Sequence, residues 1–198
     1  VMGGIGMKAI VLAAGKGKRL ASEQHTLPKV MRLVNGKPLL QYVLDAISFI
    51  PQQDTVVVVG YKKEKVLEGI SGDYRFAVQE QQLGTGHAVQ QARNYFENGE
   101  GHIVVLCGDV PLITSNTVKK AIEYAKAGRY NAVVISARVE DPSGYGRLVR
   151  NSRGDFLRIV EHRDASEEEK LIDEINSGLY VFSAKELSEA INLLTNNN

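Results

Sequence analysis

Short runs of apolar residues alternate along the chain with longer amphipathic segments. The runs consist mostly of consecutive Val, Ile and Leu, which is typical of strands that are covered on both faces. Because these runs alternate with segments of helical length, the pattern predicts an α/β fold, with a mixed, mostly parallel sheet flanked by helices. The predicted strands are residues 9–12, 55–59, 76–78, 103–107 and 132–139.

Four segments between these runs have the spacing of amphipathic helices, namely residues 38–49, 62–67, 87–96 and 118–127. In the first of them, Leu40, Val43 and Leu44 fall on one helical face. Pro38 would stand at its first helical position, where the missing N–H has no cost. Thr114 is a candidate N-cap for the last segment.

After about residue 140 the alternation changes, and two strands surround a polar turn that contains Gly154. This pattern predicts a β-hairpin in place of a crossover unit. An acidic helix at 166–171, a strand at 178–182 and a helix at 185–194 are expected to follow. We therefore predict a nucleotide-binding half-domain of Rossmann-like type, followed by a β-hairpin subregion that forms a pocket wall.

The first apolar run ends in a loop that suits an anion. Gly15 and Gly17 allow close approach of the backbone, and Lys16, Lys18 and Arg19 add positive charge. Neither G-x-x-x-x-G-K-[ST] nor G-x-G-x-x-G matches this spacing. The loop is therefore a phosphate site of another type, or a plain strand-to-helix turn with solvated lysines.

Two further charged residues are expected near this loop, because ligands bind beyond the carboxyl ends of parallel strands. Lys29, which follows a proline in L-P-K-V, offers a point charge for phosphate. Asp109 follows an apolar strand in C-G-D-V-P-L, where a carboxylate is suited to hold Mg²⁺ against phosphate oxygens. One protein carboxylate is enough, since Mg²⁺ keeps most of its waters.

A polar segment, Q-E-Q-Q-L-G-T-G-H-A, follows the predicted strand at 76–78 and opens the next helix. The amides of Gln79 and Gln82 can read the donors and acceptors of a flat base. Gly84 and Thr85 allow backbone approach and a hydroxyl contact. His87 in the same segment suggests a general base, although a single helical histidine is more often structural.

Composition narrows the classes of protein and of partner. The 24 Lys and Arg residues nearly balance 23 Asp and Glu residues, so nonspecific nucleic-acid binding is not expected. No apolar stretch approaches the roughly 18 residues of a membrane span, and no signal peptide is evident. A single cysteine, Cys107, is expected to be a small buried hydrophobe and fits a cytoplasmic protein.

The chain resembles a known family in several segments spread from about Met7 to its last residue. It is similar to the N-terminal uridylyltransferase domains of bacterial bifunctional enzymes that also carry a glucosamine-1-phosphate acetyltransferase. The segments that carry the resemblance are L-A-A-G-K-G-K-R-L, L-P-K-V, G-K-P-L-L, Q-L-G-T-G-H-A, G-D-V-P-L, D-P-S-G-Y-G-R-L-V-R, I-V-E-H-R-D-A and E-I-N-S-G-L-Y.

The resemblance implies transfer of a uridylyl group from UTP to N-acetylglucosamine 1-phosphate, giving UDP-N-acetylglucosamine and pyrophosphate for cell-wall precursors. Mg²⁺ would be the cofactor, held by Asp109. The remaining site residues that it implies are Leu12, Ala13 and Gly15 at the nucleotide, Arg19 and Lys29 at the phosphates, Gln79, Gly84 and Thr85 at the uracil, and Gly146, Glu161 and Asn176 at the sugar.

The resemblance also shapes the expected domain organisation. Residues 7–198 would form one nucleotidyltransferase domain cut short at its C-terminus, and residues 1–6 would be a tag remnant. The acetyltransferase β-helix, through which the full-length family forms homotrimers, and a second magnesium-binding asparagine would lie outside this chain. Two alternatives stay open: a nucleotidyltransferase for another sugar phosphate, and a nucleotide-sugar-binding fragment without catalysis.

Overall fold

The computed structural model describes residues 6–15, 27–97 and 99–194, and it divides the chain into two compact units. Unit 1 contains residues 1–133 and 180–198, and unit 2 contains residues 134–179. Arg19, which was predicted to contact phosphate, lies outside the described residues, as do Lys16 and Lys18 of the same loop.

Unit 1 is built on parallel strands. Their hydrogen-bonded order is β5 (Arg75–Val78), β4 (Thr55–Val59), β1 (Met7–Leu12) and β6 (His102–Cys107), with β10 (Glu174–Ser183) next to β6. The register places Leu12 beside both Val58 and Cys107. The carboxyl ends of β1, β4 and β6 therefore meet at one edge of the sheet.

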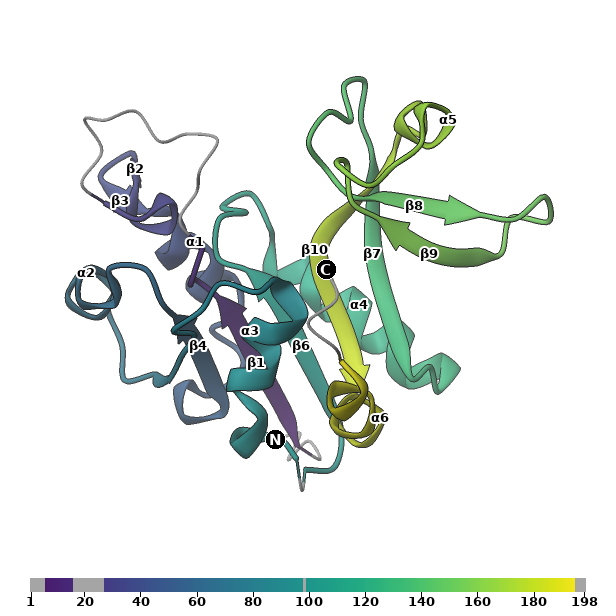
Figure 1. Cartoon of the computed structure of the whole chain (residues 1–198). Coiled ribbons are helices and arrows are strands. Elements are labelled where there is room, and N and C mark those ends of the chain that lie inside the picture. Colours follow the sequence, from purple (N-terminus) through teal and green to yellow (C-terminus); the bar gives the residue numbers. More distant parts are fainter. Residues whose placement is uncertain (1–5, 16–26, 98, 195–198) are drawn as a thin grey trace. The chain divides into compact units, whose positions relative to one another are not determined.

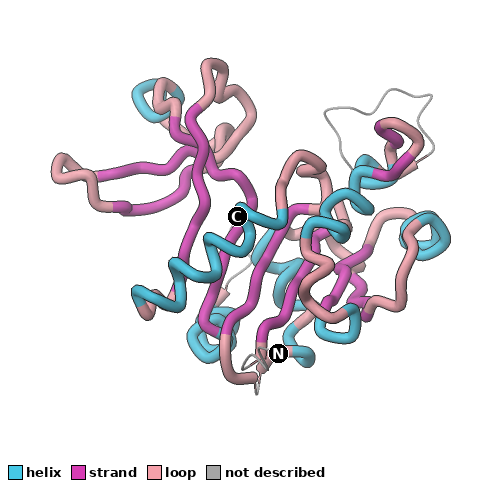
Figure 2. The backbone as a smooth tube through the Cα atoms, turned by 180° about the vertical axis from the view of Figure 1, so that it is seen from behind, coloured by secondary structure: helices cyan, strands magenta, loops and turns pink. Residues whose placement is uncertain are grey.

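Helices cover both faces of this sheet (Figures 1 and 2). One face carries α3 (Thr85–Gln91) and α6 (Ala184–Ala190), and the other carries α1 (Leu39–Ala46) and α4 (Ser115–Gly128). The other described elements of unit 1 are α2 (Lys63–Gly69), β2 (Leu33–Val34), β3 (Lys37–Pro38) and the 3-10 turns η2 (Lys29–Met31), η3 (Gln52–Asp54), η4 (Arg93–Tyr95) and η5 (Ile191–Leu193).

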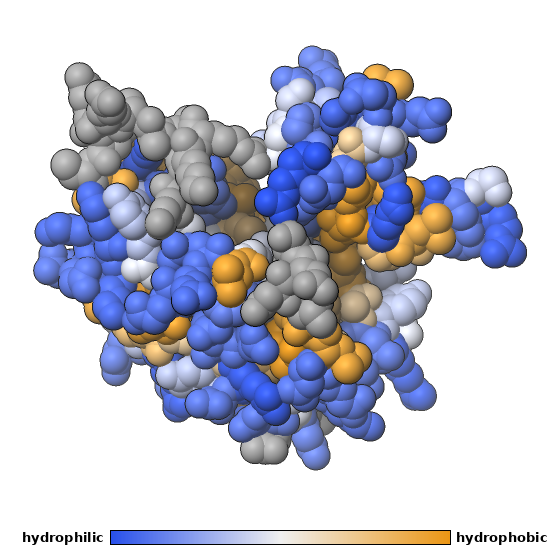
Figure 3. Space-filling view, viewed as in Figure 1, coloured by the Kyte–Doolittle hydropathy of each residue, from blue (hydrophilic) through white to orange (hydrophobic). Residues whose placement is uncertain are grey.

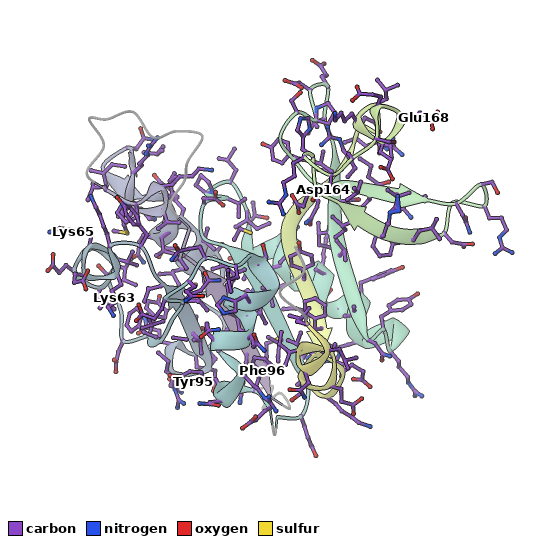
Figure 4. The ribbon with its side chains drawn as sticks, in the orientation of Figure 1. Lys63, Lys65, Tyr95, Phe96, Asp164 and Glu168 are labelled. Atoms are coloured by element: carbon purple, nitrogen blue, oxygen red, sulfur yellow. The ribbon has the colours of Figure 1, made fainter. Side chains whose placement is uncertain are left out.

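The core follows from the alternation of side chains along the buried strands. Ile10, Val56 and Val58 pack on the face that α3 and α6 cover, together with Phe96, which is 2% exposed. Tyr95, beside Phe96 in Figure 4, donates its hydroxyl to the carbonyl of Phe76 at 3.0 Å. Burial on both faces explains why these strands consist of continuous apolar runs.

The bounds of the predicted helices differ from those in the structure, and two of the differences lie near the ends of helices α1 and α3. The helix expected at 38–49 is shorter, and Pro38 belongs to β3 with an extended ψ of 143°. Pro38 is therefore the residue before the helix rather than its first residue. The helix expected at 87–96 begins two residues earlier, at Thr85, and is followed by the separate turn η4.

Unit 2 contains the predicted hairpin, formed by β8 (Arg147–Arg150) and β9 (Phe156–Val160). Figure 3 shows apolar residues over this hairpin, where Phe156 and Leu157 are exposed. β7 (Ala132–Arg138) and β10 pair with each other and continue from one unit into the other, and α5 (Glu167–Lys170) follows β9. The strand expected at 178–182 begins earlier, at Glu174, because Ile175 pairs with Arg147 of β8.

Glu174 is a buried carboxylate in unit 2. Its two carboxylate oxygens accept hydrogen bonds at 2.8 Å from Nη2 and Nε of Arg150, and a third at 2.6 Å from the hydroxyl of Ser136. These hydrogen bonds, first that of Arg150 and then that of Ser136, lower the pKa of Glu174 from 4.5 to about 2. The charged form of Glu174 therefore ties β7, β8 and β10 together.

We expect the substitution Glu174→Gln to reduce the free energy of unfolding at pH 7 by about 1–3 kcal/mol, since the charge-assisted bonds weaken and Arg150 loses its carboxylate. The pKa of Glu174 is lower in the folded state than in the unfolded state. Its contribution to the free energy of unfolding is therefore full above pH 4.5 and declines as the pH falls toward 2. Urea denaturation at pH 7 and pH 3 measures both effects.

Glu168→Gln is the matched control, because Glu168 is exposed on α5 (Figure 4) and the substitution removes the same charge. If both variants lose the same free energy of unfolding at pH 7, Glu174 does not stabilise the fold through Arg150 and Ser136.

Candidate functional site

A cavity of about 320 Å³ lies in unit 1, at the carboxyl edge of its parallel strands. Its volume is within the range of sites for small molecules. Segments that are distant in the sequence meet here. The lining residues are Leu12, Ala14, Gly15, Lys29, Val30, Gln79, Gln82, Gly84, Thr85, Ala88, Cys107 and Asp109.

The strand ends next to this cavity are closely packed. The N–H of Ala13 donates to the carbonyl of Val58 at 2.8 Å, and that of Gln79 donates to Val59 at 2.7 Å. Gly60 allows this approach, because a Cβ there would lie 2.8 Å from the Gln79 carbonyl oxygen. Gly60 was not predicted to matter, since nothing in the sequence shows that the chain passes so close to residue 79.

Lys29 and Asp109 form an ion pair at the cavity, with 2.6 Å between Nζ and Oδ2. Their side chains are 33% and 32% exposed, so solvent screens the pair and its contribution to folding stability is small. Lys29 comes from η2, and Asp109 follows β6. The fold thus brings together a cation and a carboxylate that are 80 residues apart.

Asp109 fits the requirements of a divalent cation. Only one of its carboxylate oxygens pairs with Lys29, and the side chain faces a solvent-accessible cavity that suits a phosphate. Among the described residues there is no cluster of three or more His, Cys, Asp or Glu side chains that could hold a metal by itself. Such a donor set suits Mg²⁺, which takes one or two carboxylates and completes its shell with water and substrate oxygens.

Gln79 is the buried polar residue of the cavity, at 3% exposure. Its Nε2 donates to the carbonyl of Gly84 at 3.1 Å and lies 2.9 Å from Nδ1 of His87. The amide nitrogen is therefore occupied by protein groups, which leaves the amide oxygen for a ligand. Gln82 is exposed and donates its own amide to the Gln79 backbone carbonyl at 3.3 Å.

Most of the residues predicted at the nucleotide therefore line one cavity. Leu12, Gly15 and Thr85 line it, whereas Ala13 is 1% exposed and is not part of the lining. The prediction that Cys107 is a buried hydrophobe was wrong, because it is only half-buried and lines the cavity. It stands at the end of β6, where the strand leaves the core. The lining residues not predicted are Ala14, Val30, Ala88 and Cys107, each within three residues of a predicted one.

A second cavity in unit 1, of about 270 Å³, is different in character. It lies beside α3 and α6, and its described lining carries no charged side chain. Phosphate binding needs positive charge or a metal ion, so the cavity at Lys29 and Asp109 is the candidate site.

Unit 2 brings together the three residues predicted at the sugar. A Cβ on Gly146 would lie 3.3 Å from Oε1 of Glu161 and 3.6 Å from Cβ of Asn176. The backbone N–H of Asn176 donates to the carbonyl of Gly146 at 2.9 Å. A carboxylate and an amide thus flank bare backbone, and both can form hydrogen bonds with hydroxyl groups.

Arg147, which the sequence analysis did not single out, supports this group from within unit 2. It is 1% exposed, and its guanidinium donates to the carbonyls of Tyr145 and Lys170. The same group lies 3.3 Å from Nδ1 of His162. Arg147 therefore holds the backbone that leads into Gly146. Its burial has no signal in the sequence, where an arginine next to a glycine is typical of an exposed loop.

We expect Lys29→Met to weaken the binding of pyrophosphate roughly 10- to 100-fold, since a charge-assisted contact of this kind contributes roughly 1.5–3 kcal/mol. The melting temperature should change little, because the ion pair with Asp109 is partly exposed. Calorimetric titration with pyrophosphate and thermal melting measure the two effects.

Lys65→Met is the control, because Lys65 lies on α2 (Figure 4), where it pairs with Glu68 at 3.3 Å. The role assigned to Lys29 is wrong if both variants bind pyrophosphate equally well.

Comparison with known proteins gives consistent matches over nearly the whole chain. The family model described as nucleotidyl transferase matches residues 8–197. A Clostridioides difficile protein named bifunctional protein GlmU is 48% identical over 96% of this chain. Its namesake from Thermoanaerobacter pseudethanolicus is 45% identical over 98% of the chain. The chain spans 41% of the length of each of these relatives.

Two solved structures share the fold. A Bacillus anthracis protein assigned as a glucose-1-phosphate thymidylyltransferase matches with a TM-score of 0.76 and 23% identity, over 96% of this chain and 76% of its own. HddC from Yersinia pseudotuberculosis matches with a TM-score of 0.67 and 25% identity, over 92% and 79%. These likenesses confirm the predicted α/β fold. In the described part of the chain, every helix is too short or too polar to cross a membrane.

Proposed function

The chain belongs to the nucleotidyl transferase family, and from this premise we propose that it transfers a uridylyl group from UTP to N-acetylglucosamine 1-phosphate. The products are UDP-N-acetylglucosamine and pyrophosphate. One observation above all supports the proposal: Lys29, Asp109 and Gln79 line one cavity at the carboxyl edge of the sheet. About 45% identity to bifunctional GlmU proteins supports the choice of substrates.

The chemistry needs positioning and charge neutralisation more than proton transfer. A phosphate oxygen of the sugar 1-phosphate, which is already anionic, attacks the α-phosphorus of UTP. The bond from that phosphorus to the bridging oxygen of the β-phosphate breaks, and pyrophosphate leaves with the electron pair. No protein base is required, and the residues of the cavity orient the two phosphates in line.

Lys29 neutralises charge that develops on the α-phosphate and on the leaving group. Asp109 would hold Mg²⁺, which when bound offsets negative charge on the phosphate oxygens. When a nucleotide enters, the Lys29 ammonium has a second anionic partner besides Asp109, and the partial exposure of the pair keeps both groups accessible. Arg19, which lies outside the described residues, stays a prediction for the same phosphates.

The remaining residues of the cavity bind the base, and a separate group binds the sugar. The amide oxygen of Gln79 suits the N3–H of uracil, and Gly84 and Thr85 lie beside it in the lining. We assign Leu12, Ala13 and Gly15 to backbone contacts with the nucleotide. In unit 2, Glu161 and Asn176 would accept hydrogen bonds from the sugar over the bare backbone of Gly146.

A matrix of nucleotides and sugar phosphates tests the assignment directly. Pyrophosphate release is measured with UTP, dTTP, ATP and CTP, each against N-acetylglucosamine 1-phosphate and glucose 1-phosphate. Preference for UTP with N-acetylglucosamine 1-phosphate is the expected result. Preference for dTTP with glucose 1-phosphate would favour the activity assigned to the Bacillus anthracis neighbour. Binding of the sugar nucleotide without turnover would identify a binding module.

We expect Asp109→Asn to reduce magnesium-dependent pyrophosphate release at least 100-fold, because the neutral amide is a poor ligand for a hard cation. The fold should persist, since the carboxylate is partly exposed. Asp73→Asn, an exposed position beyond α2, is the control. Unchanged release by the Asp109 variant would remove this residue from the site.

We expect Gly146→Ala to raise the KM for the sugar phosphate about 10-fold and to leave the KM for UTP nearly unchanged. The added methyl would lie 3.1 Å from Cγ2 of Ile159 and 3.3 Å from Oε1 of Glu161, so it displaces the carboxylate. Steady-state kinetics with each substrate varied in turn measures both constants. A rise in the KM for UTP alone would place Gly146 elsewhere in the site.

A further inference from the structure

His87 is a polar residue that the phosphate chemistry does not use. It is half-buried on α3, and its ring lies between two glutamine amides. Nδ1 is 2.9 Å from Nε2 of Gln79, and the ring Nε2 is 3.2 Å from Nε2 of Gln91. The imidazole therefore contacts the buried amide that lines the candidate nucleotide cavity.

The backbone carbonyl of Gly84 determines the direction of these hydrogen bonds. The carbonyl of Gly84 only accepts, so the atom of Gln79 that lies 3.1 Å from it must be the amide nitrogen. This same nitrogen lies 2.9 Å from Nδ1 of His87, and the contact is a hydrogen bond when Nδ1 accepts. Both amide hydrogens of Gln79 are thereby engaged, and its oxygen Oε1 is the atom that remains for a ligand of the cavity that Gln79 lines.

The neutral imidazole has one accepting nitrogen, so it can accept from Gln79 or from Gln91 but not from both. The contact with Gln79 is shorter, and Gln79 is nearly fully buried. Gln91 has another acceptor, because its Nε2 also lies 3.1 Å from the backbone carbonyl of His87. The tautomer that leaves Nδ1 free to accept is therefore favoured.

We infer that His87 is a positioning residue that determines base selectivity by fixing the amide orientation of Gln79. With both amide hydrogens of Gln79 held by protein groups, its Oε1 accepts from a base that carries a ring N–H, such as the N3–H of uracil. It repels the bare N3 of cytosine, which is itself an acceptor. The inference rests on the proposed function, because it assumes that Gln79 meets the base of the nucleotide.

Without the acceptor at Nδ1, Gln79 keeps one partner, Gly84, and its amide can rotate. We expect His87→Phe, which keeps a ring but removes the acceptor, to raise the KM for UTP about 10-fold. The preference for UTP over CTP should fall by a similar factor, which corresponds to one hydrogen bond. The kcat should change little, because His87 touches neither the phosphates nor the reacting atoms.

The substitution His87→Asn distinguishes the effect of the hydrogen bond from that of the aromatic ring. The oxygen of the asparagine amide stands near the place of Nδ1 and can accept from Gln79. We expect this variant to recover most of the wild-type affinity for UTP and of the preference over CTP. A merely structural role for His87 would give the opposite order, since phenylalanine fills the space of the imidazole better than asparagine does.

A double-mutant cycle tests whether His87 acts through Gln79. Gln79→Ala should lower the preference for UTP, and adding His87→Phe to it should cause no further loss. Additive losses would show that His87 acts by another route and would overturn the inference. His102→Phe is the control, because His102 is also half-buried but stands at the opposite end of β6 from Asp109.

Two measurements keep this test distinct from that of the proposed function. Calorimetric titration with UTP and with CTP gives the affinity ratio, and pyrophosphate release gives turnover. A wild-type chain that releases no pyrophosphate refutes the proposed transfer, while the affinity ratios still test His87. Equal UTP-to-CTP ratios in wild type and in a folded His87→Phe variant overturn the inference and leave the proposed transfer standing.

Discussion

The parallel register of β1 with its two neighbours is the constraint on which the candidate site depends. Leu12 stands beside Val58 on one side and Cys107 on the other, so three strands end at one level. Parallel strands need long connections, and those connections return the chain to the same edge each time. Residues as distant in sequence as Lys29 and Asp109 meet there because the backbone hydrogen bonds of the sheet fix where each strand stops.

Charge is used differently in the two units. Glu174 is buried and has three close donors from Arg150 and Ser136, so its pKa is low and its charge contributes to folding. Lys29 and Asp109 are about one-third exposed, and their pair contributes little to stability. A pair that the fold does not need can exchange partners with a ligand at small cost. This difference in burial separates a structural ion pair from the pair that we propose to bind phosphate and Mg²⁺.

Several predictions from the sequence failed where packing decided the outcome. Cys107 ends an apolar run, which predicts a core position, yet β6 leaves the core at that residue and exposes it to the cavity. The last long strand begins at Glu174 rather than at residue 178, because Ile175 finds its partner in Arg147 of the hairpin. Arg147 itself is buried through contacts with the backbone of Tyr145 and Lys170. Apart from Tyr145, none of these partners is close in sequence.

The sequence by itself determined the α/β class, the positions of the buried strands and the residue types that the site draws on. Buried strands can be predicted from continuous apolar runs, because burial on both faces requires such runs. Candidate site residues can be predicted just after these runs, because strand ends lie at the edge of the sheet. Only the tertiary structure decided that Gly60 must lack a side chain, that Lys29 pairs with Asp109 and that the ring of His87 contacts the amide of Gln79. Those outcomes depend on distances between segments far apart in the chain, which local patterns of polarity do not encode.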